Sequence, residues 1–273
     1  MSPYRHRTIH VGDIQTHYLE AGEGPCLILL HGGEYGACAE ATWRWNIAGL
    51  SHTFRVIAPD MLGYGGTDKI YSFSDPAGFR INHLKRFLQA LGLRGACFIG
   101  SSAGGGTLLR AAVIEPPPFE MKKMVTVCSN ASLFKTDAQE LIESYTPSTQ
   151  GMAKIMGILF HDKKWLAEEH VRERYENSLI PGSWETIAAA RLRRPGHRSR
   201  ANTEEFVRKL SSVRIPCLII SCDHDPLNQE DWDARLQKIL HGSRIHRFRH
   251  SAHEPQIEEA EEFNRVVTEF LLQ

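Results

Sequence analysis

The stretch Gly100-Ser101-Ser102-Ala103-Gly104 decides the fold that we expect for this chain. It follows the apolar segment 96–99 and precedes a helix-like segment, residues 107–112. A serine between two glycines at a sharp turn from strand to helix is typical of a nucleophile elbow, because glycines let the backbones pass closely there. Ser102 is therefore the candidate nucleophile. Taken alone, the five residues are explained equally well by an ordinary glycine-rich turn.

A nucleophile elbow also requires an oxyanion hole, which is expected earlier in the chain. The stretch His31-Gly32-Gly33 ends a buried-strand pattern over residues 26–30. Glycines at that point let backbone N–H groups approach a substrate carbonyl, so we expect the amides of Gly33 and Ala103 to hold the developing oxyanion. An ordinary turn at a strand end would need the glycines but not the histidine before them.

The catalytic acid is expected after the apolar run 216–222, which ends in Asp223-His224-Asp225-Pro226. Both aspartates would share one face if the strand continued. We favour Asp225, because the strand should end near Cys222 and leave Asp225 on the following turn, which Pro226 stiffens. Asp223 is the alternative, and as a solvated or capping carboxylate it would take no part in catalysis.

The catalytic histidine comes from a group of four, His241, His246, His250 and His253. Residues 243–250 have a strand pattern that places His246 and His250 on one face beside Phe248. His253 lies between this strand and a helix predicted over residues 258–272. A histidine held there can reach the serine and exchange a proton near neutral pH, so we favour His253 over the surface role that a single histidine usually has.

The close spacing of His246, His250 and His253 also raises the question of a metal site. A mixed strand-and-loop segment without a cysteine or an H-E-x-x-H pattern does not bring such ligands together on one face. We therefore expect no metal and no other cofactor.

Composition excludes several other classes of protein. The 273 residues contain 32 Lys plus Arg and 32 Asp plus Glu, so no overall charge attracts nucleic acid or an anionic membrane. The five arginines of segment 191–200 favour a solvated connector, with an anion-attracting pocket rim as the alternative. Six scattered cysteines indicate a reducing compartment, and no signal peptide or membrane span is visible, so we expect a cytoplasmic protein. A small-molecule substrate and at most a homodimer partner are expected.

The order of segments predicts an α/β fold. A hairpin pattern covers residues 8–20, strands are predicted at 55–60 and 124–128, and a helix at 75–91, which implies a mostly parallel sheet flanked by helices. Residues 134–206 have only helical patterns. We expect them to form a cap on a core domain of residues 1–133 and 207–273, with an apolar pocket between cap and core. The large apolar cap residues are Met152, Met156, Phe160, Trp165 and Trp184.

The ordered motifs around Ser102, Asp225 and His253 resemble the α/β-hydrolase fold over essentially the whole chain. Within it, the chain is most similar to the meta-cleavage-product hydrolases, which cut carbon–carbon bonds in vinylogous diketones from aromatic-ring degradation. The similar pieces are His31-Gly32-Gly33-Glu34-Tyr35-Gly36-Ala37, the cap segment 156–176 and residues 262–267.

The resemblance also implies substrate-binding residues. Arg174-Tyr175-Glu176 resembles a cap motif whose arginine binds the substrate's carboxylate and ketone, although a surface salt bridge explains Arg174 equally well. The family has asparagine where this chain has Ser101, and tryptophan where it has Glu254. Both positions shape the pocket, so the substrate is left open among an ester, a lactone and a different β-diketone. The substrate-binding candidates are Gly32, Ser101, Arg174, Trp184 and Glu254.

The resulting hypothesis is a serine hydrolase that transfers an acyl group to water through a Ser-His-Asp triad. A small-molecule receptor of the same fold with weak hydrolysis is the alternative, because fold and function are separable. Turnover discriminates the two.

Overall fold

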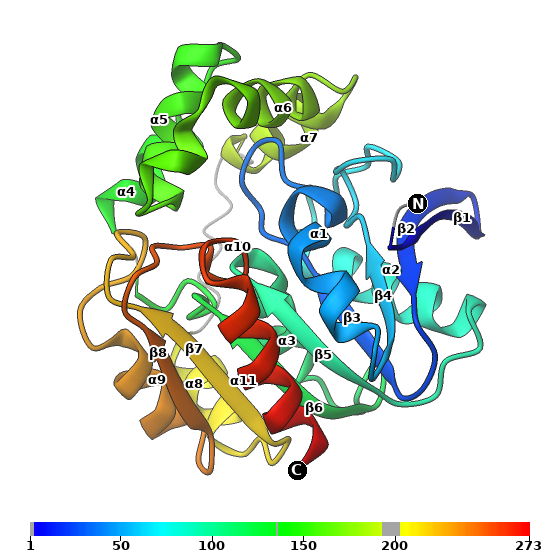
Figure 1. Ribbon diagram of the computed structural model, residues 1–273. Helices are drawn as coiled ribbons and strands as arrows, with labels where there is room; N and C mark the ends of the chain where they lie inside the picture. Colours follow the sequence, from blue (N-terminus) through cyan, green and yellow to red (C-terminus); the bar gives the residue numbers. More distant parts are fainter. Residues whose placement is uncertain (1–2, 135, 193–202) are drawn as a thin grey trace.

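The computed structural model describes residues 3–134, 136–192 and 203–273, which form an eight-stranded sheet covered by helices (Figure 1). The strand order is β1-β2-β4-β3-β5-β6-β7-β8. The strands are β1 Arg5–Val11, β2 Ile14–Ala21, β3 Cys26–Leu30, β4 Arg55–Pro59, β5 Ala96–Ser101, β6 Met121–Val127, β7 Cys217–Cys222 and β8 Arg244–Phe248. The β1–β2 and β2–β4 pairs are antiparallel and all others are parallel, which confirms the predicted mostly parallel sheet.

The helices of the core alternate with these strands. They are α1 Ala39–Leu50, α2 Pro76–Ala90, α3 Ala103–Ala111, α8 Thr203–Ser211, α9 Trp232–Ile239, α10 Pro255–Glu258 and α11 Ala260–Leu272. The helix predicted over residues 258–272 is present as α11 but begins at Ala260, because the helical path is interrupted at Glu259, between α10 and α11. There the backbone leaves the helical region, with φ −125° and ψ 48°, and the Glu259 carboxylate accepts a hydrogen bond of 2.6 Å from the hydroxyl of Ser251.

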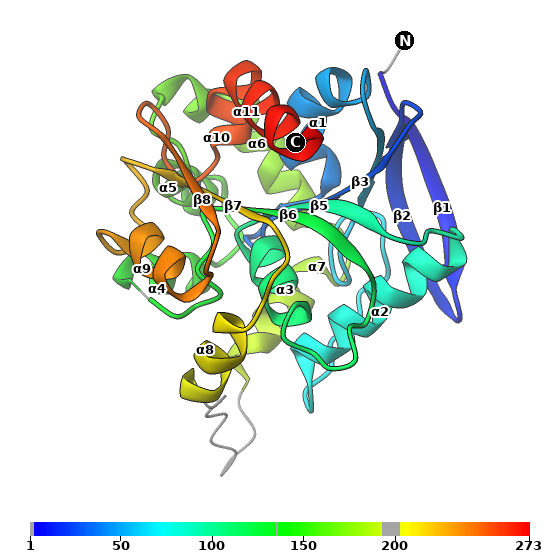
Figure 2. The ribbon, with the colours of Figure 1, turned by 90° about the horizontal axis from the view of Figure 1, so that it is seen from below.

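Helices cover both faces of the sheet (Figure 2), and a separate apolar core is buried on each face. Helices α1 and α11 pack on one face through residues such as Trp43 and Phe263. Helices α2, α3, α8 and α9 cover the other face, where Phe87 and Leu108 are buried. Because both faces are covered, the parallel strands are almost continuously apolar, as in β3 Cys-Leu-Ile-Leu-Leu.

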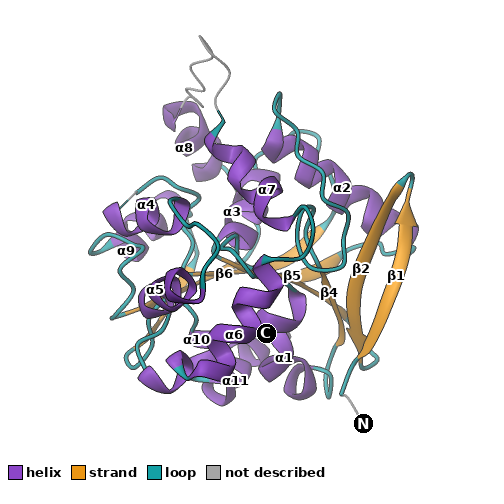
Figure 3. Cartoon of the chain, turned by 90° about the horizontal axis from the view of Figure 1, so that it is seen from above, coloured by secondary structure: helices purple, strands orange, loops and turns teal. Residues whose placement is uncertain are grey.

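A layer of helices lies over the carboxyl ends of the strands, and it is seen from above in Figure 3. It comprises α4 Asp137–Glu143, α5 Thr149–Leu159, α6 Glu168–Ser178 and α7 Ser183–Ala188, with 3₁₀ turns η1 Lys163–Leu166 and η2 Ala189–Arg191. Its own apolar cluster contains Met152, Met156, Phe160 and Trp165, so these large side chains pack the layer together. The assignment of residues 134–206 as a separate cap stays a prediction. The predicted boundary at residue 206 falls inside helix α8, which extends from Thr203 to Ser211.

Three further features concern the sequence-based expectations. All six cysteines are free thiols. None of the helices within the described ranges has the length and apolarity that crossing a membrane requires. Of the arginine-rich segment, Arg191 donates a hydrogen bond to the hydroxyl of Tyr35, whereas its residues 193–200 lie outside the described residues.

Candidate active site

Ser102 occupies a strained turn between β5 and α3. Its backbone has φ 48° and ψ −110°, a region that non-glycine residues rarely adopt, and its N–H donates a 2.8 Å hydrogen bond to the carbonyl of Val127. A Cβ on Gly100 would lie 2.5 Å from the backbone of Gly104, and a Cβ on Gly104 would lie 2.4 Å from the carbonyl oxygen of Leu30. Both glycines of the motif are therefore required by the turn that presents the serine.

Asp225 and His253 are brought together from the loops after β7 and β8. The ring Nδ1 of His253 lies 3.0 and 2.9 Å from the two carboxylate oxygens of Asp225. The carboxylate also accepts hydrogen bonds from the backbone of Leu227 at 2.9 Å and the side-chain amide of Asn228 at 2.7 Å. Because all of these donors converge on Asp225, its orientation is fixed and it fixes the imidazole in turn.

Asp223 lies apart from this arrangement. Its carboxylate is 3.8 Å from the guanidinium of Arg247, and 40% of its side chain is exposed. The structure therefore places Asp225, and not Asp223, against the histidine. This follows from the end of β7 at Cys222, which leaves Asp225 on the turn that follows the strand.

Asp225 and His253 shift each other's pKa. The pKa of His253 is lowered by burial, but the neighbouring charge and hydrogen bonds of Asp225 dominate and raise it to about 9. Burial alone would raise the pKa of Asp225, and the charge and hydrogen bond of His253 hold it below its ordinary value. The geometry therefore favours the charged imidazolium that a general base must form during proton transfer.

Ser102 and His253 line the same cavity. The Nε2 atom of His253, which would accept the serine proton, has no hydrogen-bond partner among the described residues. The hydrogen bond between the serine and the histidine is therefore not formed in this structure, although the two side chains open into one space. Catalytic hydrogen bonds are often long or unformed before substrate binds.

The predicted oxyanion loop lies beside the elbow. A Cβ on Gly33 would lie 2.7 Å from the Cβ of Ala103, so only glycine fits at this position. The hydroxyl of Tyr64 donates a 2.8 Å hydrogen bond to the carbonyl of Gly33, and His31 accepts one of 2.9 Å from the backbone of Met61. These bonds hold the loop to the segment after β4, and the close approach of Gly33 to Ala103 places the loop beside the start of α3.

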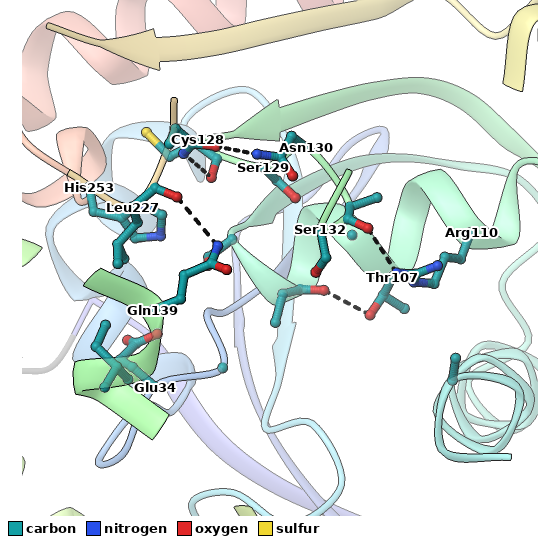
Figure 4. A pocket seen from close by; sticks show the side chains of 18 of the residues that line it. Glu34, Thr107, Arg110, Cys128, Ser129, Asn130, Ser132, Gln139, Leu227 and His253 are labelled. Carbon is teal, nitrogen blue, oxygen red and sulfur yellow. Dashed lines mark hydrogen bonds between the residues drawn. The ribbon is translucent and has the colours of Figure 1, made fainter. Parts of the chain in front are cut away.

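The cavity at this site has a volume of about 370 Å³, within the range of small-molecule pockets. Figure 4 shows it from close by. Its lining residues are Gly33, Glu34, Ala77, Arg80, Ile81, Ser102, Ala103, Gly106, Thr107, Arg110, Cys128, Ser129, Asn130, Ala131, Ser132, Gln139, Ile142, Glu143, Leu159, Leu227, Asn228 and His253. Many of them are polar or charged, so the pocket is less apolar than the sequence suggested.

Arg174 is engaged by a residue that the sequence analysis did not single out. Its Nη1 atom lies 3.0 Å from Oε1 of Glu34, and the two side chains are only 5% and 4% exposed. Of the two interpretations that the sequence left open, the structure shows an ion pair, and it is a buried pair rather than a surface one. Arg174 is not among the residues that line the cavity.

The other four substrate-binding candidates also lie outside the cavity lining. Ser101 is completely buried and its hydroxyl has no hydrogen-bond partner among the described residues. The indole of Trp184 donates a 3.2 Å hydrogen bond to the carbonyl of Tyr145 within the cap cluster. Gly32 lies under the Glu34 carboxylate, which would be 2.2 Å from an added Cβ.

Glu254 is completely buried behind the histidine and accepts a hydrogen bond from the side-chain amide of Gln256. Burial and the nearby charge of Glu34 raise its pKa to about 8, against the opposing effect of Arg174. The direction of this shift has a simple cause, because a neutral acid is far cheaper to bury than a carboxylate.

The three histidines considered as metal ligands do not gather. His246 is 4.0 Å from Glu262, and the backbone of His250 bonds to Glu259. Among the described residues, one group could hold a metal, formed by Cys128, Asp225 and His253, whose ligand atoms lie within 4.8 Å of one another. Burial raises the thiol pKa of Cys128 well above its ordinary value, which opposes the thiolate that a metal needs.

Comparison with known proteins defines the class to which this fold and site belong. The model of the Alpha/beta hydrolase family matches residues 27–266, and the chain belongs to that family. It is an enzyme of the hydrolase class, with meta-cleavage product hydrolases among its relatives.

Individual relatives narrow the comparison. The chain is 30% identical to the 2-hydroxy-6-oxo-2,4-heptadienoate hydrolase of Pseudomonas putida, over 97% of this chain and 95% of that protein. It is also 30% identical to a 2-hydroxymuconate semialdehyde hydrolase of a Pseudomonas species, over 99% of this chain and 95% of that protein. A solved structure of a meta-cleavage product hydrolase from Pseudomonas fluorescens superposes with a TM-score of 0.87 at 28% identity, and 97% of each chain is covered.

Sequence reasoning missed several residues of the site. Glu34 directly follows the quoted glycines and was visible as a charged residue in an apolar loop. Arg110 repeats the spacing of Ala103, Gly106 and Thr107 on α3, a pattern that predicts one shared helix face. Asn228 gave no signal, because its contact with Asp225 depends on the folded turn.

Proposed function

We propose that the chain is a serine hydrolase whose triad is Ser102, His253 and Asp225, and that it cleaves the carbon–carbon bond next to a ketone in a vinylogous diketone. The observation that carries this proposal is the shared cavity. One wall presents a strained serine after β5, and the other presents a histidine whose Nδ1 is held by Asp225 and whose Nε2 has no hydrogen-bond partner among the described residues.

The first half of the reaction forms an acyl-enzyme. His253 takes the proton of Ser102 as the serine oxygen attacks the carbonyl carbon, and Asp225 stabilises the imidazolium. The negative charge moves to the carbonyl oxygen, where the amides of Gly33 and Ala103 hold it; each such donor contributes about 3 kcal/mol to the transition state. The bond to the leaving group then breaks as His253 returns the proton to it.

The second half repeats the same steps with water. His253 takes a proton from water as the oxygen attacks the acyl-enzyme, and it returns the proton to Ser102 as the acid product leaves. One water is consumed and the serine is regenerated, so the chemistry needs no further reactant.

The nature of the leaving group supports a vinylogous diketone. A carbanion is a poor leaving group unless a neighbouring carbonyl stabilises it as an enolate or dienolate. The names of two relatives, a 2-hydroxy-6-oxo-2,4-heptadienoate hydrolase and a 2-hydroxymuconate semialdehyde hydrolase, describe substrates with conjugated carbonyl groups of this kind. The leaving group of an ester or a lactone is an alkoxide, and these compounds react through the same steps. Esters and lactones are therefore the competing substrates.

A product assay on three substrates tests this proposal. The purified chain is given an aryl ester, a macrolactone and a vinylogous diketone, and the highest kcat/KM is expected for the diketone. Ser102→Ala should abolish turnover of all three. Wild-type rates in that variant would show that Ser102 is not the nucleophile. A higher kcat/KM for the lactone or the ester would be compatible with the triad but would contradict the proposed substrate class.

The same assay separates an enzyme from a receptor with weak hydrolysis. We expect many product molecules per protein molecule within minutes. A single turnover followed by retention of the product would indicate the receptor.

A further inference from the structure

Two free thiols lie side by side at the ends of β6 and β7. The Sγ atoms of Cys128 and Cys222 are 3.6 Å apart, and both side chains are buried. Cys128 directly follows β6, and Cys222 is the last residue of β7. The sulfurs would have to approach each other by about 1.5 Å to reach the length of a disulfide bond, which is about 2.05 Å.

The backbone turns Cys128 toward the neighbouring strand. Side chains alternate between the two faces of a regular strand, so Val127 and the residue after it would point to opposite faces. Cys128 instead has φ 48°, in the left-handed region, and it packs in the same apolar core as Val127 and Cys222. Its N–H donates a 2.8 Å hydrogen bond to the carbonyl of Ile220, which continues the pairing of the two strands.

The strand register brings the two Cα atoms within disulfide range. Val127 pairs with Ile220, so Cys128 follows opposite Ser221, and Cys222 is one residue further. Neighbouring strands are about 4.8 Å apart and one residue adds about 3.3 Å along the strand, which gives a Cα separation of about 6 Å. Disulfides span Cα separations of about 4.4–6.8 Å, so the bond can form without separating the strands.

Cys128 is the member of the pair that a small molecule can reach. It lines the cavity that contains Ser102, whereas Cys222 is not among the described residues of the lining. Figure 4 shows Cys128 and His253 among the side chains of this pocket. A nitrogen of His253, an oxygen of Asp225 and the sulfur of Cys128 all lie within 4.8 Å of one another. A small oxidant that enters the cavity therefore meets Cys128 first, with the second thiol next to it.

We propose that Cys128 and Cys222 form an oxidative modification site, in which a hydroperoxide converts the two thiols to a disulfide that reversibly lowers turnover. The Cys128 sulfur attacks one peroxide oxygen, the O–O bond breaks, and the thiol proton goes to the departing oxygen. This step gives a sulfenic acid and an alcohol, or water from hydrogen peroxide. The Cys222 sulfur then attacks the Cys128 sulfur, the S–O bond breaks, and hydroxide leaves with the second thiol proton as water. The thiols lose two electrons and the peroxide gains them.

The disulfide would disturb the support of the catalytic acid. The amide of Asn228 donates to the carbonyl of Cys128 at 3.1 Å and to the carboxylate of Asp225 at 2.7 Å. Cys222 begins the turn that carries Asp225. The carbonyl of Ala252, the residue before the candidate base, lies 4.0 Å from the Cys128 sulfur. Because a displacement of about 1 Å in a catalytic group can cost about 100-fold in rate, we expect kcat to fall by about 10–100-fold.

Burial makes this pair slow to oxidise and slow to reduce. Burial raises the pKa of Cys128 well above its ordinary value, and it also raises the pKa of Cys222. The thiolate is the nucleophile, so a raised pKa slows the attack on peroxide. Reduction releases a thiolate into the same buried surroundings, and a thiol of high pKa is a poor leaving group. The disulfide should therefore persist once it has formed.

Peptide mapping of the oxidised protein tests the pair directly. The reduced chain is treated with millimolar hydrogen peroxide, its remaining thiols are alkylated, and it is digested without reductant. Mass spectrometry should find the peptide of Cys128 joined to that of Cys222, with a loss of about 2 Da for the two hydrogens removed. The absence of this crosslinked peptide overturns the proposal. A crosslinked protein with unchanged kcat overturns the effect on turnover.

Two variants separate a thiol pair from a single reactive thiol, each compared with its own untreated sample. In Cys222→Ser, the sulfenic acid of Cys128 has no thiol partner, so prolonged peroxide should oxidise it to a sulfinic acid that dithiothreitol does not reduce. Wild type should instead regain its kcat in dithiothreitol. Cys217→Ser changes another buried cysteine of β7 and should behave as wild type does. Irreversible inactivation of wild type, as in Cys222→Ser, would contradict the proposal.

The crosslink is measured without substrate, so its outcome is independent of the proposed hydrolase function. Activity that survives Ser102→Ala overturns the hydrolase mechanism and leaves the disulfide intact as a finding. An active wild type that forms no crosslink in peroxide overturns the disulfide alone.

Discussion

The guanidinium of Arg174 and the carboxylate of Glu34 form a buried ion pair 3.0 Å apart, which joins α6 to the loop after β3. Gly36 fits closely beneath the same arginine, because an added Cβ would lie 2.2 Å from the carbonyl oxygen of Arg174. A residue that sequence similarity suggests as a substrate anchor thus holds the two parts of the molecule together.

Breaking this pair should destabilise the fold. Glu34→Met leaves the Arg174 cation buried without its partner, so we expect the free energy of unfolding to fall by about 3–5 kcal/mol. Glu34→Met combined with Arg174→Met removes both charges and should lose much less than the sum of the single variants. Urea unfolding of the four proteins in a double-mutant cycle measures the coupling. Additive losses would show that the two side chains do not interact in solution.

The two aspartates after β7 should differ sharply in their effect on turnover. Asp225→Asn removes the carboxylate that holds the ring of His253, and we expect kcat to fall by about 10⁴-fold. Asp223→Asn is the matched control, because Asp223 faces Arg247 and should change kcat less than about 2-fold. Steady-state kinetics on an aryl ester measures both. Equal losses would place Asp223 in the catalytic machinery.

The raised pKa of His253 makes both activity and stability depend on pH. A general base must be neutral, so kcat/KM should rise with pH toward an apparent pKa of about 9. A folded pKa above the ordinary value near 6.5 gives stability that is fully present below about 6.5 and is lost as the pH rises through about 9. The stability advantage of wild type over His253→Asn should shrink over this interval.

Proton NMR titration of the ring protons of His253 gives the value itself. In Asp225→Asn, burial still lowers the pKa whereas the charge of Asp225 is gone, so the titration should move to lower pH. An unchanged titration in that variant would contradict the assignment of the shift to Asp225.

A single methyl group at Gly33 should disable the oxyanion hole. The added Cβ of Gly33→Ala would lie 2.7 Å from the Cβ of Ala103, so the loop must move away from the elbow. We expect kcat to fall by about 10²–10³-fold with little change in KM. Gly157→Ala is the control, because its Cβ would meet no atom closer than 3.8 Å and it lies exposed on α5. It should keep full activity, and comparable losses in both variants would argue against a specific role for Gly33.

The fold and the elbow could be predicted because their signals are local. Each signal comes from residues that are adjacent in the sequence. These signals are the glycines two residues from Ser102, the apolar run before each turn, and the position of Asp225 on the turn after β7. The contact between Glu34 and Arg174 spans 140 residues and depends on how α6 docks, so no short pattern contains it. The same is true of Glu254, which its position after His253 marks as important but whose burial only the packed helices determine.

Helix boundaries show a further reason for the failures. Residues 258–272 have one continuous helical pattern, yet the side chain of Glu259 bonds to Ser251 and the helix is interrupted there. A side-chain contact with the preceding loop overrides local propensity, and it lies just beyond the loop that holds His253. The helix interruption that the sequence pattern does not predict thus lies next to the loop of His253, a candidate catalytic residue.

The backbone N–H of His253 donates a 2.9 Å hydrogen bond to the carbonyl of Leu159, the last residue of α5. The loop that carries His253 is therefore tethered to α5, whose last residue Leu159 also lines the cavity. Any shift of α5 at this point therefore also moves the peptide of His253, the proposed general base. We therefore expect substitutions at the end of α5, although distant from Ser102 in the sequence, to change kcat as well as KM.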